Sequence, residues 1–287
     1  MADDVALCRG SAPVLAYNRA VPEPQLLAVI PLVALGVAFA FFVGMPAAIR
    51  RGFWVRPRFE ALGIDEAIVE LNRPELAEAD RRFDELSEQL GQLGYRETDR
   101  FVAPEFASRC LVAILLMHDS RDDTIAGVQL VWHGDASDRR LQLRGEYYGF
   151  VSCYDAPNAA TGTLTVQTST SPQLFPMPRD TQFLCVDWLR DPAEVHELHR
   201  RHCDQARPRE SRPAVSTDDA RDGLLRRHAR TLARAVEVGY LHPERPGLLR
   251  LTRRGALHVT TQLIWPIAPA VKARQRLATR RQIAAWR

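Results

Sequence analysis

The pattern of hydrophobic and polar positions begins with one long uncharged run. No residue from Pro24 to Ile49 is charged, and 12 of the 20 residues from 26 to 45 are Leu, Ile, Val or Phe. Twenty helical residues rise about 30 Å, which is the thickness of the bilayer core. A helix that is apolar on every face over that length is typical of a membrane span. The pattern therefore predicts a transmembrane helix over residues 25–49.

The charges that flank this run predict its orientation. Four arginines follow it closely and two precede it: Arg50, Arg51, Arg56 and Arg58 after the run, and Arg9 and Arg19 before it. Cytoplasmic flanks are enriched in Lys and Arg, so we expect a single-pass protein of the cell membrane. Its N-terminal tail, residues 1–24, would lie outside and its C-terminal part in the cytoplasm. A cleaved signal peptide is the alternative, which the long polar segment before the run disfavours.

Small residues recur within the uncharged run. Gly36, Ala40 and Gly44 fall four positions apart. Small residues at this spacing allow two transmembrane helices to approach closely, which predicts helix packing and a homodimer through this face. The alternative is that small residues are simply frequent in an alanine-rich apolar helix.

After residues 50–74, which resemble a linker, the pattern turns helical and then strand-like. Residues 75–94 repeat apolar positions at about 3.6 residues, as an amphipathic helix does. Four apolar, β-branched runs then form two hairpin patterns, at residues 110–118, 124–133, 145–155 and 162–170. A second helix is expected over residues 191–205, capped by Asp191 with Pro192 at its first position.

These elements predict an α+β domain over residues 75–205, in the order helix, antiparallel four-stranded meander, helix. Residues 206–216 resemble a second linker. Residues 217–287 predict a basic helix–hairpin–helix segment, with its first helix over 217–238 and a hairpin turn at residues 244–247. The uncharged stretch 255–271 leaves three alternatives: an interfacial segment on an anionic leaflet, a segment buried in the domain, or a second span.

The distribution of charge bears on partners. The formal net charge is +3, but residues 200–287 hold 20 Arg or Lys and seven Asp or Glu. This excess predicts an anionic partner, which could be a membrane surface with anionic lipid headgroups, a nucleic acid, or the acidic part of the same chain. Five widely spaced cysteines without a C-x-x-C motif do not form a disulfide framework, which favours reduced thiols.

The stretch EVHELHRRHC, residues 194–203, carries the candidate chemistry. On a helix its imidazole and thiol groups lie three or four positions apart, a spacing that lets pairs of them reach one zinc ion. The candidate ligands are His196, His199, His202 and Cys203. Zinc would need further ligands from elsewhere, and HELH is one residue short of the zinc-protease motif H-E-x-x-H. The alternative is an amphipathic helix whose histidines border its buried face, with no cofactor.

No other catalytic motif is present, since G-x-S-x-G, G-x-G-x-x-G and the phosphate-binding loop are all missing. The sequence therefore favours a protein that is not an enzyme. The expected role is binding or scaffolding at the cytoplasmic face of a membrane. A metal-binding protein is the first alternative, with metal-dependent hydrolysis as the activity it would allow.

Two resemblances complete the sequence evidence. The basic helix LLRRHARTLARAV followed by GYL…LRLTRRG, within residues 218–258, resembles the recognition helix and wing of winged-helix DNA-binding domains. That resemblance implies contacts to an anionic partner by a set of arginines, namely Arg226, Arg227, Arg230, Arg234, Arg253 and Arg254, in a membrane-tethered DNA-binding protein. The whole order of elements also looks like that of uncharacterised single-pass membrane-anchored bacterial proteins, a resemblance that implies no activity.

Overall fold

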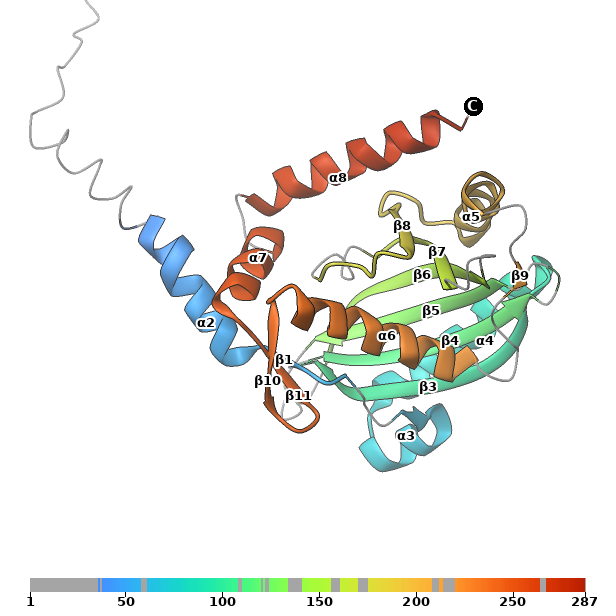
Figure 1. Cartoon of the computed structure of the whole chain (residues 1–287). Coiled ribbons are helices and arrows are strands. Elements are labelled where there is room, and N and C mark those ends of the chain that lie inside the picture. Colours follow the sequence, from blue (N-terminus) through green and yellow to red (C-terminus); the bar gives the residue numbers. More distant parts are fainter. Residues whose placement is uncertain are drawn as a thin grey trace, which may run out of the picture.

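The computed structural model describes most of the chain outside its N-terminal part (Figure 1). The described residues are 36, 38–57, 61–107, 110–119, 121, 124–133, 141–155, 161–169, 175–207, 212–213, 220–263 and 267–286. The helices within them are the π-helical turn η1 (Ala40–Gly44), α2 (Met45–Gly52), α3 (Ile64–Leu71), α4 (Pro74–Gln92), α5 (Pro192–Ala206), α6 (Ala220–Glu237), α7 (Arg253–Leu263) and α8 (Ile267–Ala284).

Eleven strands are described, several of them only two residues long. They are β1 (Trp54–Val55), β2 (Leu62–Gly63), β3 (Arg96–Ala107), β4 (Cys110–Asp119), β5 (Thr124–His133), β6 (Gln142–Asp155), β7 (Thr161–Gln167), β8 (Thr181–Cys185), β9 (Arg212–Pro213), β10 (Leu241–Arg245) and β11 (Leu248–Leu251). Strands β3 to β7 pair antiparallel in chain order, and β8 adds parallel to β7. Short strand β2 pairs with β3, and β9 with β6.

A small three-stranded unit, β10–β11–β1, continues the sheet at its other end. Trp54 and Val55 of β1 pair with β11, while the backbone of Val55 also pairs with that of Ala107 in β3. This one residue pair is the only described connection by strand pairing between the small unit and the main sheet. The region expected to be a linker, residues 50–74, therefore contributes β1, β2 and α3 to the fold.

Helices cover both faces of the main sheet (Figure 1). Alternate residues of a strand point to opposite faces, so each strand serves two cores. On one face Tyr148 and Phe150 of β6 pack with the buried sides of α4 and α5. On the other face Phe101 and Ile114 pack with Ala220 of α6. A third core joins α6 to β1, β10, β11 and α7.

Local sequence signals explain where the helices begin. Pro74 occupies the first position of α4, where its missing N–H leaves no bond unmade. The side chain of Asp191 accepts a hydrogen bond from the backbone N–H of Ala193 at 2.9 Å, which caps α5 as the sequence predicts.

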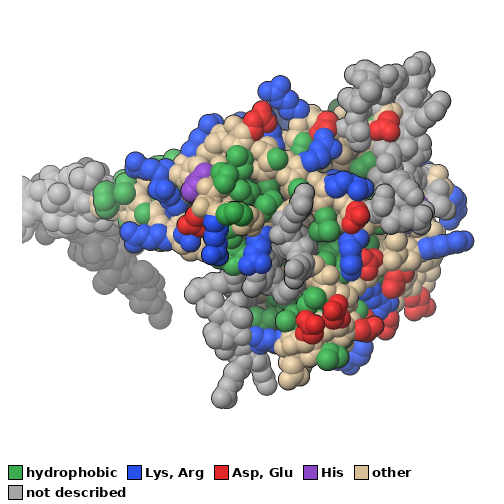
Figure 2. Space-filling view, turned by 60° about the horizontal axis from the view of Figure 1, so that its bottom comes forward, with side chains coloured by type: hydrophobic (Ala, Val, Ile, Leu, Met, Phe, Trp, Pro, Cys, Tyr) green, Lys and Arg blue, Asp and Glu red, His purple; other side chains and the backbone are tan. Residues whose placement is uncertain are grey.

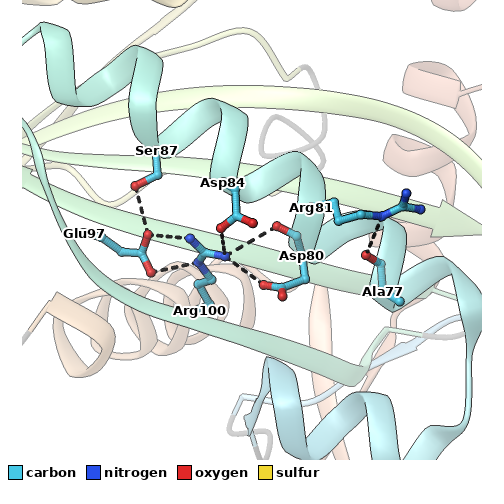
Figure 3. A network of polar contacts seen from close by, with 7 residues as sticks. All are labelled: Ala77, Asp80, Arg81, Asp84, Ser87, Glu97 and Arg100. Carbon is cyan, nitrogen blue, oxygen red and sulfur yellow. Dashed lines mark hydrogen bonds and ion pairs between the residues drawn. The ribbon is translucent and has the colours of Figure 1, made fainter.

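An ionic network centred on Arg100 holds α4 against β3 (Figure 3). The Arg100 guanidinium lies 2.8 Å from carboxylate oxygens of Asp80, Asp84 and Glu97. The Ser87 hydroxyl donates to Glu97 at 2.9 Å and extends the network along the helix. Hydrogen bonding to Glu97, and then to Asp80 and Asp84, raises the pKa of Arg100 above its usual value. The charged side chain of Arg100 on β3 thus pairs with carboxylates of α4.

The predicted transmembrane helix over residues 25–49 is wrong. Among the described residues no helix is both long enough and apolar enough to span a membrane. Helix α2 ends at Gly52 after two arginines and packs against α7, and the side chains of Phe41 in η1 and Pro46 in α2 are buried. The single-pass topology and the cell-membrane localisation that depended on this helix are corrected with it. Residues 1–35, including the N-terminal tail 1–24, lie outside the described part of the chain.

The predicted four-stranded meander is also too small. The structure adds β3 before it and β8 after it, so five antiparallel strands and one parallel strand replace four. Strand β3 opens with the polar sequence RETDR, which hides the alternation of a strand. Its Arg100 pairs with α4, and its Asp99 pairs with Arg221 of α6. The C-terminal hairpin is present as β10 and β11 with its turn at the predicted position. Stretch 255–271 spans α7 and the start of α8, and Ala256 and Val259 are buried.

Candidate functional site

The three histidines of α5 contact different sets of side chains, although the rings of His196 and His199 both lie against Phe150. The His196 ring packs edge-on against Tyr95, with 5.4 Å between ring centroids. The His202 ring stacks on Trp286 of the C-terminal segment at 5.3 Å. His199 makes a hydrogen bond to Ser152 of β6. The imidazoles of α5 are therefore part of the core packing around this helix.

His199 belongs to a buried polar cluster with two residues that sequence analysis missed. Its Nε2 lies 2.9 Å from Ser152 Oγ and 3.4 Å from Cys203 Sγ. Ser152 Oγ is in turn 2.8 Å from Thr124 Oγ1, on the neighbouring strand β5. Ser152 shares the helix-facing side of β6 with Phe150, two positions earlier. The one sequence signal for Ser152 is that a polar residue occupies a strand position whose alternate neighbours are apolar core residues.

The electrostatics of this cluster keep it neutral. Complete burial, together with the nearby rings of His202 and His196, lowers the pKa of His199 to about 3. Desolvation also lowers the pKa of His202. A general base works best with a pKa near the operating pH, so His199 is poorly suited to take a proton from Ser152 or Cys203. No described residue hydrogen-bonds to the Nδ1 atom of His199, so none of them orients the ring from that side.

The candidate zinc ligands do not converge in the structure. Within the described residues no group of three or more His, Cys, Asp or Glu side chains is placed to hold a metal ion. His199 and Cys203 do lie together, whereas His196 and His202 face aromatic rings elsewhere. Two ligands are fewer than a zinc site uses. Cys185, a further thiol close in sequence, has its pKa raised to about 11 by burial and by Asp187.

The six arginines proposed as anion contacts are divided by the fold. On α6, Arg230 pairs with Asp180, and Arg234 lies 2.6 Å from Glu237. Arg227 points to the sheet, where its Nη1 is 3.6 Å from Cys153 Sγ. Arg226 is exposed. Helix α6 packs on β3, β4 and β10, so the helix that resembles a recognition helix covers the sheet with one side.

The remaining two arginines, Arg253 and Arg254, lie near two others in the last turn of α2. Arg50 and Arg51 end α2, while Arg253 and Arg254 open α7, and the two helices pack together. Ile49 of α2 and Ala256 of α7 share the third core, which brings these two helix ends together. The backbone carbonyl of Arg51 also accepts a hydrogen bond from Arg250 of β11 at 3.2 Å. We name Arg50, Arg51, Arg253 and Arg254 the α2–α7 arginine cluster.

The cluster carries little compensating negative charge. Arg50, Arg51 and Arg253 are exposed and form no ion pair with any described residue. Arg254 donates to the carbonyl of Val238 at 3.0 Å and lies over the ring of Tyr240. Both contacts fix the position of the Arg254 guanidinium without neutralising its charge. The nearest acidic residue in sequence to Arg250, Glu244, is already paired with Arg250.

Exposed apolar side chains lie next to this cluster along the N-terminal helix. They are Phe39, Phe42, Val43 and Met45, and Phe39 is 64% exposed. Figure 2 shows hydrophobic side chains at the end of the projecting part of the molecule, with Lys and Arg side chains behind them. Gly36, Ala40 and Gly44 are exposed, and nothing lies within 4 Å of a Cβ built at either glycine. No described residue therefore supplies the packing partner expected at these small residues.

Comparisons with known proteins add no family to this picture. No protein-family model, curated protein or solved structure matches the chain. The candidate function rests on the geometry of the chain alone.

Proposed function

We propose that this protein is a binding or scaffolding protein that engages an anionic surface through the α2–α7 arginine cluster. The observation that carries the proposal is the convergence of three exposed arginines, Arg50, Arg51 and Arg253, without ion-pair partners among the described residues. Elsewhere on the described surface many arginines are paired, as Arg230 and Arg276 are. Unpaired like charges repel one another, and an anionic partner relieves that repulsion.

Anionic lipid headgroups are the partner class that the surroundings of the cluster favour. Phe39, Phe42 and Val43 are exposed within three helical turns of Arg50 and Arg51. Apolar side chains beside cationic ones suit the boundary between lipid headgroups and acyl chains. There the apolar side chains leave water and the arginines contact anionic headgroups. A DNA backbone would use the arginines alone and would leave the aromatic side chains in water. The proposal concerns attachment at the surface of a lipid layer and involves no span.

Charge reversal tests this function. The variant Arg50→Glu, Arg51→Glu, Arg253→Glu of the full chain is compared with wild type by co-sedimentation with phosphatidylglycerol-containing vesicles. At about 1 kcal/mol per basic residue near an anionic surface, loss of three contacts weakens binding by about a hundredfold or more. Vesicles of phosphatidylcholine alone should bind neither protein strongly.

A matched control separates this cluster from net charge. Arg73→Glu, Arg81→Glu and Arg200→Glu change the same number of exposed or half-buried arginines on the far helices α4 and α5 and their flanks. That control should keep most of the vesicle binding. Equal loss in both triple variants would reduce the proposal to a general charge effect. Stronger retention on duplex DNA than on vesicles, lost in the Arg50, Arg51, Arg253 variant, would assign the cluster to nucleic acid instead.

A further inference from the structure

Arg254 differs from the other three members of the α2–α7 arginine cluster because its guanidinium is held in place. Nη1 of Arg254 donates to the backbone carbonyl of Val238 at 3.0 Å, and its Cζ lies 5.1 Å from the centroid of the Tyr240 ring. A cation over the face of an aromatic ring is attracted to it. No described residue holds the side chains of the other three arginines in this way. The cluster therefore contains one positioned guanidinium.

The backbone that carries Arg254 is fixed against the end of α6. The backbone N–H of Thr252 donates to the carbonyl of Tyr240 at 3.0 Å, and the Thr252 hydroxyl accepts from the N–H of Gly255 at 3.0 Å, which caps α7. A Cβ built on Gly255 would lie 2.0 Å from the Tyr240 carbonyl oxygen. Only glycine therefore allows α7 to begin this close to the ring that supports Arg254.

One edge of the Arg254 guanidinium is open. The side chain is exposed, and no described residue hydrogen-bonds to its Nε or Nη2. This edge carries two parallel N–H groups, which match two oxygens of one phosphate group. Because the guanidinium is already positioned, it loses less conformational entropy on binding than a free side chain does. Arg253, the neighbouring exposed arginine, can add charge to the same anion.

We infer that Arg254 binds a terminal phosphate monoester of a lipid headgroup, as in phosphatidic acid, through its Nε and Nη2 groups. The inference rests on the proposed function and names the lipid class that the α2–α7 arginine cluster prefers. A monoester ends the headgroup with three free oxygens and a charge of about −1.5 to −2 at pH 7. Two of these oxygens suit Arg254 and leave one for Arg253. The phosphate of a phosphodiester headgroup has two free oxygens and is flanked by groups on both sides.

The variant Arg254→Lys tests this preference, because it keeps the charge and removes the paired N–H groups. Full-length protein is sedimented with phosphatidylcholine vesicles that contain either phosphatidic acid or phosphatidylglycerol, in amounts that give equal surface potential. Wild type should bind the phosphatidic acid vesicles about tenfold more tightly, since hydrogen bonds to charged groups are the strong ones. Arg254→Lys should lose most of this preference and keep its binding to phosphatidylglycerol within about threefold.

Arg253→Lys is the matched control, because it makes the same change at an exposed arginine whose guanidinium no described residue holds, and it should keep the preference. An undiminished preference in Arg254→Lys, or equal binding of wild type to both kinds of vesicle, would overturn the inference and leave the proposed function standing. Binding of wild type to neither kind would remove both. Titration with inorganic phosphate separates the sources: phosphate that binds wild type but not Arg254→Lys, without a preference between vesicles, would make the ligand a soluble phosphate and overturn the lipid assignment.

Discussion

His199 shows how burial can decide what a reactive-looking residue does. Its hydrogen bond to Ser152 and its contact with Cys203 reproduce the pairings of nucleophilic catalysis. Its lowered pKa, about 3, comes first from burial and keeps the imidazole neutral in the folded protein. The cluster therefore contributes hydrogen bonds inside the core, and we expect changes in it to alter the free energy of unfolding.

The pH dependence of stability follows from that residue. Unfolded His199 takes up a proton near pH 6.5, whereas the folded residue resists protonation down to about pH 3. The unfolded state then binds more protons between these values, so the free energy of unfolding falls as pH falls, by up to about 1.4 kcal/mol per unit. The lowered pKa of His202 acts in the same direction. Urea unfolding at about pH 7 and pH 5 should show a smaller loss for His199→Gln than for wild type, and equal losses would contradict this account.

At the scale of elements, α8 is attached to the main domain through its own polar and aromatic side chains. Arg276 forms two hydrogen bonds of 2.8 Å with Asp187, and Arg280 lies over the ring of Trp188. Trp286, just after the helix, stacks on the buried ring of His202. The basic C-terminal segment is thus docked by its arginines rather than displaying all of them to an external partner.

Removing the aromatic contact should loosen this helix alone. Trp286→Ala deletes the ring that covers His202 and packs on the main core. The free energy of local opening of α8 should therefore fall by about 1–3 kcal/mol. Hydrogen exchange of α8 amides should become faster while β4 and β5 stay protected. Leu277→Ala on the exposed side of the same helix is the matched control and should leave exchange unchanged. Unaltered exchange in Trp286→Ala would mean that Arg276 and Arg280 suffice.

Some elements of the fold could be predicted from the sequence, and others could not. Strands β4 to β7 carry apolar alternation or continuous apolar runs, and Asp191 with Pro192 announces α5, so all of these could be predicted. Short strands such as β1 exist only because β11 supplies a partner far along the chain. The uncharged run before Arg50 predicts a span by its length and composition, neither of which records where the helix ends or what packs against it. Within the candidate sites, the contacts of Ser152 with His199 and of Arg227 with Cys153 depend on packing that no local pattern records.

At the scale of the whole molecule, the described fold contains two packing units joined by α6. The third core draws its fully buried residues from β1, α6, β10, β11 and α7, whereas the main cores belong to β3 to β8 with α3, α4, α5 and the start of α6. Strand pairing between the units is limited to Val55 and Ala107. The smaller unit also carries Arg253 and Arg254 of the α2–α7 arginine cluster. We therefore expect this unit to open locally without loss of the main sheet.

A core substitution in the smaller unit tests this division. Leu232, in the second half of α6, is 1% exposed and belongs to the third core. Leu232→Ala should cost about 2–5 kcal/mol and speed hydrogen exchange in β10, β11 and α7, with β4 and β5 still protected. Leu86→Ala in α4 removes the same atoms from the main core and should have the reverse pattern. If Leu232→Ala exposes β4 and β5 as strongly as β10 and β11, α6 couples the two units into one cooperative structure. Binding at the arginine cluster would then be linked to the stability of the main sheet, because a partner that holds the smaller unit would hold both.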